Sequence, residues 1–331
     1  MLFETDLSSR VFCRHKHFDV DELVVLSGYV GFAPVKELEK LPLKSTVIYG
    51  MYGEERISEK LHRALKSLDI SQKDTSIFYS SIPVHSKCYL WKKNNKIVTA
   101  LIGSANFSMK GLTTDYREVL AETTSDSFKE LSNYVDMVLN RSISCLSDDI
   151  EYKSFNKRNK IESATLQPDN EYIVELPLTL EDGTVPINSG INWGCSKANG
   201  SHVAWGDAEI RIRRNMIETH PKMFPPKKLF ASKKIIGAKK NRENDVVEFI
   251  WDDGTNMVML FEGNNTYNGI KYPKQICSSS SKKELGIYLR NRLGVSLEHV
   301  ITAEDLSRYG RKTITLTMVA EGIYEADFSV K

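Results

Sequence analysis

The sequence predicts two domains of different class, an α/β domain followed by a mainly β domain. Residues 1–150 alternate short apolar strands with amphipathic helices, whereas the second half shows short strands separated by turn residues. A polar, highly charged stretch lies between them, and 331 residues are too many for one typical domain. We therefore expect one domain at residues 1–158, a linker at residues 159–170 and a second domain at residues 171–331.

The first domain is expected to be an α/β sandwich around a parallel or mixed sheet, because strands and helices alternate along it. The helical spacing of apolar residues is clearest at residues 54–68 and 128–139. A short helix is expected at residues 35–41. The expected strands are residues 23–30, 46–52, 76–79, 84–91 and 96–103.

The second domain is expected to be an open β-barrel, since most of its elements are short strands. Two acidic triplets that end in glycine, residues 181–183 and 252–254, mark turns. One clear helix, residues 282–293, interrupts the strands. The expected strands are residues 172–180, 208–213, 246–251, 256–261 and 313–319.

Composition is ordinary for a soluble protein, with 41% hydrophobic and 27% charged residues. The longest apolar stretch, residues 23–35, is too short to span a bilayer, and residues 1–6 lack the features of a secretory signal. The five cysteines are widely spaced and form no C-x-x-C motif. They predict free thiols in a reducing cytoplasm, and we expect neither a metal site nor a cofactor.

The most informative motif is His85-Ser86-Lys87, which lies in a predicted β-hairpin and is followed by Gly103-Ser104-Ala105-Asn106. Residues two apart in a strand share a face, so His85 and Lys87 are expected to point the same way. A turn centred near Asn94 would place His85 opposite Gly103. The alternative interpretation is a solvated strand face, but the combination with the glycine-serine segment favours a phosphate site.

Four side chains of this hairpin suit chemistry on a phosphodiester. The neutral imidazole of His85 can attack phosphorus and form a covalent phosphohistidine. Lys87 and Asn106 would hold the non-bridging oxygens, and Ser104 would add a hydrogen bond. A second, protonated histidine must donate to the leaving oxygen. We expect it to come from a second copy of the chain, which predicts a homodimer.

The pairing of H-x-K with a downstream G-S-x-N resembles the signature of the phospholipase D superfamily. The resemblance carries over to the four residues above, and it implies that Glu118 orients the histidine. The superfamily's Asp, five residues after the lysine, is replaced by Lys92. That departure argues against a lipase, since nuclease branches often lack this Asp. A second H-x-K, at His220 and Lys222, lies in a Pro-rich stretch and is interpreted as coincidence.

Longer segments of the second half resemble the NgoFVII family of restriction endonucleases. They are residues 189–194, 284–294 and 305–311. The resemblance implies an N-terminal phospholipase D-like α/β/α sandwich and a C-terminal DNA-binding pseudobarrel like that of plant B-three transcription factors. Where relatives show a Gln after the Trp-Gly pair, this chain has Cys195. The target sequence is therefore expected to differ.

A DNA-binding surface is also indicated by charge. Residues 211–240 contain ten Lys or Arg residues and one acidic residue, which favours a polyanion-binding surface over a merely solvated basic face. The resemblance implies two arms that embrace the major groove, with other basic residues on phosphates. The expected residues are Asn192, Lys197, Asn199 and His202 in one arm, Lys271, Lys274 and Gln275 in the other, and Arg211, Arg213, Arg214, Lys233 and Lys234 on phosphates.

The leading hypothesis is a metal-independent, sequence-specific, type II-like restriction endonuclease that cleaves double-stranded DNA. Two alternatives remain: a phosphodiesterase of the phospholipase D superfamily with another substrate, and a DNA-binding protein that needs a partner for cleavage. The resemblance implies a cognate DNA methyltransferase as a partner. The chain has no phosphate-binding G-x-x-x-x-G-K-[ST] loop, so any ATP dependence would come from a helicase-like ATPase partner.

Overall fold

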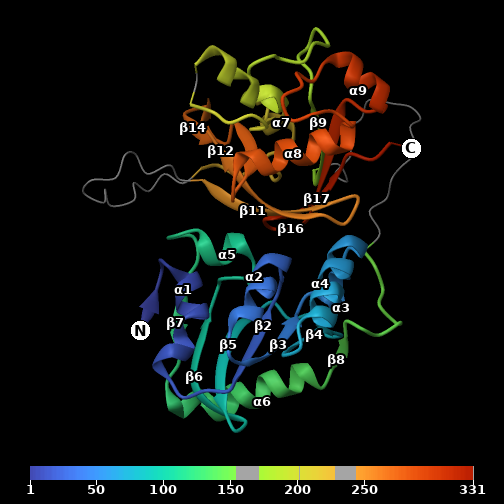
Figure 1. Cartoon of the computed structure of the whole chain (residues 1–331). Helices are drawn as coiled ribbons and strands as arrows, with labels where there is room; N and C mark the ends of the chain where they lie inside the picture. Colours follow the sequence, from blue (N-terminus) through green and yellow to red (C-terminus); the bar gives the residue numbers. More distant parts are fainter. Residues whose placement is uncertain (154–170, 201, 228–243, 331) are drawn as a thin grey trace. The chain divides into compact units, whose positions relative to one another are not determined.

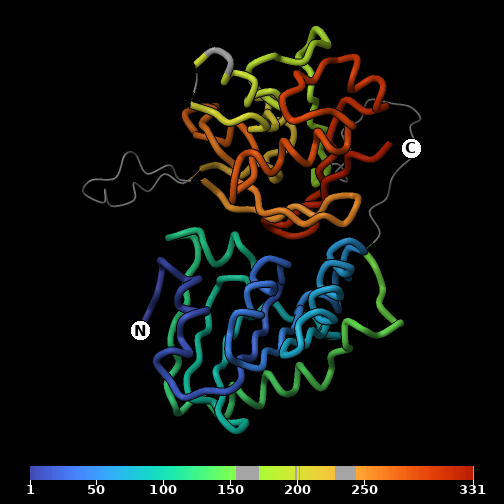
Figure 2. The backbone as a smooth tube through the Cα atoms, viewed as in Figure 1, coloured from blue at the N-terminus to red at the C-terminus, as the bar shows by residue number. Residues whose placement is uncertain are grey.

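The computed structural model describes residues 1–153, 171–200, 202–227 and 244–330. The chain divides into two units, one built mainly on residues 1–161 and the other mainly on residues 162–331. Figure 2 traces them from blue to green and from yellow to red. The predicted linker, residues 159–170, lies outside the described residues. Within the described ranges, no helix is long and apolar enough to cross a membrane.

The first unit is built on an eight-stranded mixed sheet with the order β1-β7-β6-β5-β2-β3-β4-β8 (Figure 1). The strands β2, β3 and β4 run parallel, while β5, β6 and β7 pair antiparallel with their neighbours. The prediction of a mixed sheet is confirmed. The strands are β1 Leu2–Phe3, β2 Glu22–Ser27, β3 Lys44–Tyr49, β4 Thr75–Ser80, β5 Lys87–Lys93, β6 Lys96–Gly103, β7 Leu120–Glu122 and β8 Ser142–Ser144.

Apolar side chains are buried on both faces of this sheet. On one face, Val24 and Leu26 of β2 form a cluster with Val135 and Val138 of α6. The alternate β2 residues are fully buried as well, so other helices cover the opposite face. This is the predicted α/β/α sandwich. The helices are α1 Leu7–Phe12, α2 Phe32–Glu37, α3 Tyr52–Glu55, α4 Glu59–Ser71, α5 Met109–Thr113 and α6 Phe128–Leu139.

The helix predicted at residues 54–68 is divided into α3 and α4. Arg56, which ends α3, has a φ of 63° and a ψ of −174°, a conformation that cannot continue a helix. A new helix then begins, and the Ser58 side chain caps it by accepting from the backbone N–H of Leu61 at 3.2 Å. The apolar spacing predicts a helix in this region but gives no sign of the break.

The predicted hairpin is formed by β5 and β6, with a register two residues away from the expected one. Asn94 and Asn95 both have positive φ, 49° and 64°, as a two-residue hairpin turn requires. The turn therefore lies half a residue beyond Asn94, and a β-bulge between Trp91 and Lys92 shifts the register further. As a result Lys87, rather than His85, stands opposite Gly103.

The second unit contains a seven-stranded sheet with the order β10-β15-β12-β11-β17-β16-β9 (Figure 1), in which β10–β15, β15–β12, β12–β11 and β16–β9 pair antiparallel. The end strands β9 and β10 contact each other, so the sheet forms a nearly closed barrel. Its core includes Phe249, Trp251, Phe261 and Tyr324. The strands are β9 Ile173–Pro177, β10 Ile210–Arg211, β11 Asp245–Trp251, β12 Asn256–Glu262, β15 Gln275–Ser278, β16 Thr313–Ala320 and β17 Ile323–Asp327, with a separate hairpin of β13 Asn265–Tyr267 and β14 Ile270–Tyr272.

Among the described residues of this unit, three α-helices accompany the barrel, α7 Arg214–Thr219, α8 Lys282–Leu293 and α9 Ala303–Tyr309. The prediction of α8 is confirmed at both ends, where Ser281 caps the first turn and Gly294 ends the helix in a left-handed conformation. The other two are too short to show a helical period in the sequence.

Candidate active site and DNA-binding surface

The candidate active site lies at one end of the first unit's sheet, where β2, β5 and β6 are neighbours. In the register of these strands, Ser27 stands opposite Lys87, and Lys87 stands opposite Gly103. The strands β2 and β6 end at this row and β5 begins there. His85 lies on the segment that enters β5, and Asn106 on the segment that leaves β6. Segments far apart in the sequence therefore converge at one place.

His85 and Lys87 are in direct contact. The Nζ atom of Lys87 lies 2.9 Å from Nδ1 of His85, 3.2 Å from Nε2 and 2.6 Å from the carbonyl oxygen. Burial lowers the pKa of the Lys87 ammonium, and the charge of Glu118 opposes this effect. Burial also lowers the pKa of His85; the charge of Lys87 lowers it further and that of Glu55 raises it. A lowered pKa favours the neutral imidazole, the form that can attack phosphorus.

Asn106 is held by the segment that follows β2. Its Oδ1 atom accepts a hydrogen bond from the backbone N–H of Tyr29 at 3.2 Å and lies 3.5 Å from Oγ of Ser27. The same Oγ accepts from the backbone N–H of Phe107 at 2.9 Å and donates to the carbonyl oxygen of Tyr29 at 2.6 Å. Since the amide oxygen of Asn106 is engaged, its NH₂ group is the part suited to donate to a phosphate.

Ser104 is hydrogen-bonded to Val119, the residue that follows Glu118 in the chain. The Oγ atom of Ser104 accepts from the backbone N–H of Val119 at 3.1 Å, and the backbone N–H of Ser104 donates to the carbonyl oxygen of Val119 at 3.0 Å. In the described parts of the chain, the hydrogen-bonding partner of His85 is Lys87 rather than Glu118. The implied role of Glu118 in orienting the histidine stays a prediction, and its charge raises the pKa of Lys87.

Sequence reasoning missed three residues at this site. A Cβ atom on Gly28 would lie 3.1 Å from Cδ2 of His85 and 3.4 Å from Nζ of Lys87, so both side chains pack on bare backbone. The Tyr29 ring lies edge-on to the His85 ring, with centroids 5.8 Å apart, and its hydroxyl donates to Oε1 of Glu55 at 2.6 Å. A glycine at the end of a central strand was the available signal, because it often marks a close approach.

Lys92, which replaces the superfamily's Asp, lies at the other end of β5 from the site. Its side chain is buried, and Nζ lies 3.6 Å from Oδ1 of Asp136 on α6. Lys92 therefore joins the sheet to a helix and has a structural role.

Metal-ligating side chains and cysteine thiols are other groups that could carry chemistry. Among the described residues, no three His, Cys, Asp or Glu side chains are grouped so that they could hold a metal ion. All five cysteines are free. Burial raises the pKa of Cys88, the cysteine next to Lys87, to about 11, so its thiol is protonated at neutral pH.

Asn192 is not available to DNA, which corrects its assignment to a base-contacting arm. Its side chain is fully buried. The Nδ2 atom donates to the carbonyl oxygens of Pro186, at 3.1 Å, and Ile301, at 2.7 Å. The Oδ1 atom accepts from the backbone N–H of Ile301 at 2.9 Å and from the guanidinium of Arg290 at 3.4 Å. Asn192 therefore fastens its loop to the barrel.

Most of the other DNA-binding candidates lie at the surface of the second unit. Arg213 and Gln275 are partly buried. Lys233, Lys234 and the side chain of Asn199 lie outside the described residues. The candidates with exposed side chains are Lys197, His202, Arg211, Arg214, Lys271 and Lys274.

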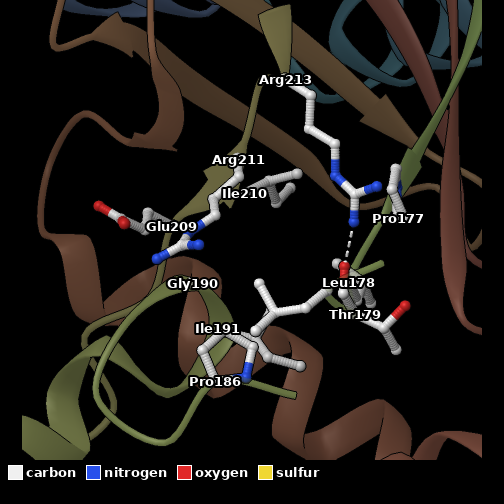
Figure 3. A pocket seen from close by; sticks show the side chains of 11 residues that line it. Pro177, Leu178, Thr179, Pro186, Gly190, Ile191, Glu209, Ile210, Arg211 and Arg213 are labelled. Atoms are coloured by element: carbon white, nitrogen blue, oxygen red, sulfur yellow. Dashed lines mark hydrogen bonds between the residues drawn. The ribbon is translucent and has the colours of Figure 1, made fainter. Parts of the chain in front are cut away.

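Two of the basic residues line a groove where the ends of β9 and β10 meet (Figure 3). The guanidinium groups of Arg211 and Arg213 lie on different sides of it, above an apolar floor that includes Ile191. Arg213 donates to the carbonyl oxygen of Thr179, and Arg211 donates to Oγ of Ser189 at 2.5 Å. Positive charge at the rim of a groove suits a phosphate backbone.

An α/β sandwich with a His–Lys–Asn site, joined to a barrel with exposed basic residues, defines a phosphodiester-cleaving nuclease with its own DNA-binding domain. Two family models match the chain in this order. The NgoFVII restriction endonuclease N-terminal PLD (phospholipase D) domain matches residues 5–152, and the NgoFVII C-terminal B3-like DNA-binding domain matches residues 166–320. The chain belongs to the NgoFVII restriction endonuclease family.

Parts of the chain are also similar to solved structures. NucT from Helicobacter pylori is 15% identical, with a TM-score of 0.34, over 44% of this chain and 97% of that one. Nuc, a phospholipase D family member from Salmonella typhimurium, is 17% identical, with a TM-score of 0.27, over 38% and 81%. Polyphosphate kinase from Porphyromonas gingivalis is 8% identical, with a TM-score of 0.30, over 46% and 26%. No curated protein sequence matches the chain.

Proposed function

We propose that this chain is a sequence-specific restriction endonuclease that cleaves double-stranded DNA through a phosphohistidine intermediate, without a metal ion. The observation that carries the proposal is the contact of His85 with Lys87, 2.9 Å between Nδ1 and Nζ, in a phospholipase D-like nuclease domain. This pair supplies a nucleophile and a cation at one place.

In the first step, a nitrogen of the neutral His85 imidazole attacks the phosphorus. An N–P bond forms while a P–O bond to the sugar breaks, and the leaving oxygen takes a proton from a second, protonated histidine. The Lys87 ammonium, which contacts the His85 carbonyl oxygen in this structure, and the amide of Asn106 bind the non-bridging oxygens. Charge that builds up on the phosphate is thereby neutralised.

In the second step, water attacks the phosphorus of the phosphohistidine. The second histidine, now neutral, takes the proton of this water, and the N–P bond breaks. His85 returns to its neutral form and the second histidine to its protonated form. The products are one DNA end with a hydroxyl group and one with a phosphate.

We assign the second histidine to His85 of a second copy, because no described histidine contacts His85 in this chain. An exposed apolar strip beside the site supports the pairing of two copies. Leu2 and Ile102 both stand opposite Ala121 on neighbouring strands and so share a face, with exposures of 62% and 39%. Val119, bonded to Ser104, is 38% exposed. Such a strip suits a two-fold interface.

The test of the mechanism is cleavage of unmethylated plasmid and phage DNA in excess EDTA by the wild type and by His85→Ala. We expect cleavage by the wild type, none by His85→Ala, and an end-labelled DNA–protein adduct that survives alkali and is lost in acid. The matched control is His17→Ala, which changes an exposed histidine of the same domain. A strict magnesium requirement, or cleavage by His85→Ala, would overturn the mechanism.

The test of the second copy is sedimentation equilibrium combined with cleavage. We expect the wild type to be a dimer and Ile102→Asp to be a monomer that does not cleave. The matched control is Ile70→Asp on α4, where the isoleucine is 69% exposed. A wild type that cleaves as a monomer contradicts the shared site.

Sequence choice is assigned to the second unit, with Lys197, His202, Lys271 and Lys274 as candidates for base contacts and Arg211 and Arg213 for phosphates. Family membership supports a cognate DNA methyltransferase that protects the same sequence, and the free cysteines are consistent with a reducing cytoplasm. A helicase-like ATPase would be a separate protein, so the same plasmid assay with and without ATP and cell extract tests for it.

A further inference from the structure

Tyr29 connects two of the candidate active-site residues to a carboxylate outside the recognised motif. It lies directly after Gly28 at the end of β2. Its ring lies edge-on to the imidazole of His85, with an interplanar angle of 80°. Its backbone N–H donates to Oδ1 of Asn106 at 3.2 Å. Its hydroxyl donates to Oε1 of Glu55 at 2.6 Å. One residue thus contacts the proposed nucleophile and a proposed phosphate ligand at once.

Glu55 is itself fixed in place. It is the last residue of α3, and its second oxygen, Oε2, accepts from Nζ of Lys153 at 3.3 Å. With both oxygens engaged, the carboxylate sets the height and direction of the Tyr29 hydroxyl. A short hydrogen bond to a charged acceptor is stronger than a neutral one. The Tyr29 ring is therefore anchored at its outer end as well as at its backbone.

We propose that Tyr29 is a positioning residue for His85 and that Glu55 anchors it. The proposal rests on the role of His85 as the nucleophile. It requires no new bond in the reaction: Tyr29 limits the rotation of the imidazole so that a ring nitrogen stays directed at phosphorus, and it holds the Asn106 amide in the same frame. Misplacement of a reacting group by about 1 Å costs on the order of 100-fold in rate.

The charge of Glu55 adds a second effect. The groups that act on the His85 imidazole are the Lys87 ammonium and the Glu55 carboxylate, with the uncharged Tyr29 ring between the imidazole and Glu55. The pKa of His85 is lowered by burial and by Lys87, and Glu55 raises it. The charge of Glu55 therefore offsets part of the decrease that Lys87 causes in the pKa of His85.

Three substitutions separate these contributions. Tyr29→Ala removes the ring, Tyr29→Phe removes only the hydroxyl, and Glu55→Gln keeps an acceptor for the hydroxyl but removes the charge. We expect the single-turnover cleavage rate to fall about 10- to 100-fold in Tyr29→Ala and several-fold in Tyr29→Phe, with the Kd for DNA unchanged. In Glu55→Gln, the pKa of His85 falls, so the acid limb of the pH–rate profile moves to lower pH.

The matched control is Glu59→Gln, an exposed carboxylate at the start of α4 whose ion pair is with Arg63. It should leave the rate and the pH profile unchanged. A structural role alone would lower Tm without moving the pH profile. Wild-type rates in both Tyr29 variants, or an unmoved profile in Glu55→Gln, would overturn the proposal. Because Tyr29→Phe and Glu55→Gln conserve shape, they keep the test valid even if Tyr29→Ala does not fold.

Failure of the positioning proposal is distinguishable from failure of the proposed function. If His85→Ala does not cleave and Tyr29→Ala cleaves normally, only the positioning role is wrong. If His85→Ala cleaves like the wild type, the nucleophile itself is wrong. The chromogenic diester bis(p-nitrophenyl) phosphate, used beside the DNA, reports on the site independently of sequence recognition.

Discussion

Nζ of Lys87 lies 2.9 Å from Nδ1 of His85 and 2.6 Å from the carbonyl oxygen of the same residue. One buried cation is therefore held against the imidazole before any substrate is bound. The contact has two consequences, one for the phosphate and one for the protonation of the histidine.

Lys87→Met should raise the pKa of His85, because a positive charge that lowers it is removed. The neutral imidazole then prevails only at higher pH, so the acid limb of the pH–rate profile moves upward. The rate on the plateau should fall about 100- to 1,000-fold, since a ligand of the transition-state phosphate is lost. NMR titration of the His85 imidazole, with wild type and Glu59→Gln for comparison, checks the direction. A downward shift would contradict it.

Gly28→Ala should reduce cleavage with little loss of stability. The added Cβ would lie 3.1 Å from Cδ2 of His85, and this side chain can move by a few tenths of an ångström at the expense of its alignment. We expect the cleavage rate to decrease by up to about tenfold. Gly50→Ala is the contrast, because its Cβ would lie 2.1 Å from the backbone carbonyl oxygen of Val84. That variant should lose about 1–3 kcal/mol of unfolding free energy. If Tm falls equally in Gly28→Ala and Gly50→Ala, the predicted difference in stability between the two variants is wrong.

Lys92→Asp should destabilise the first unit without changing its chemistry. The new carboxylate would face Asp136, now 3.6 Å from Lys92, and would stand opposite Glu22 in the sheet. We expect a loss of about 1–3 kcal/mol in unfolding free energy and a wild-type cleavage rate below the transition. Lys96→Asp, at an exposed position of the same hairpin, is the control. Denaturant titration and single-turnover cleavage measure the two quantities, and a changed rate would place Lys92 in the site.

Asn192→Ala should lower the stability of the second unit, whereas Arg211→Ala should weaken DNA binding. Loss of the Asn192 amide leaves buried backbone groups of Ile301 unpaired, which costs about 2–4 kcal/mol of stability. Arg211→Ala should leave Tm unchanged and weaken binding to all DNA sequences alike, with the slope of log Kd against log salt reduced by about 1. Thermal unfolding and fluorescence anisotropy at several salt concentrations check both. If the folded Asn192→Ala variant binds DNA more weakly, Asn192 does contribute to the DNA interface.

Local signals in the sequence determined which elements could be predicted. The helices α6 and α8 were predicted with their observed bounds, because α6 has a clear apolar period and α8 has leucines at helical spacing, Leu285, Leu289 and Leu293. The break at Arg56 and the bulge at Trp91 depend on backbone conformations that no residue pattern announced. The position of the turn and the bulge together moved the partner of Gly103 from His85 to Lys87.

The candidate site likewise contains residues that the sequence could predict and residues that it could not. His85 and Lys87 could be paired because they are two residues apart in a strand. Tyr29 and Glu55 reach them because β5 lies beside β2 in the sheet, a neighbourhood that residue spacing does not reveal. Asn192 was misassigned for a related reason, since its partners Arg290 and Ile301 lie about a hundred residues later.

The order of strands in the first unit also governs when activity can arise during biosynthesis. The row Ser27, Lys87 and Gly103 joins strands separated by β3 and β4 in the chain, so it closes only after long-range pairing. High contact order makes such closure slow relative to helix formation. A nascent chain that ends before Asn106 lacks one of the proposed phosphate ligands. The proposed site can therefore form only after the chain has been synthesised beyond Asn106 and these strands have paired.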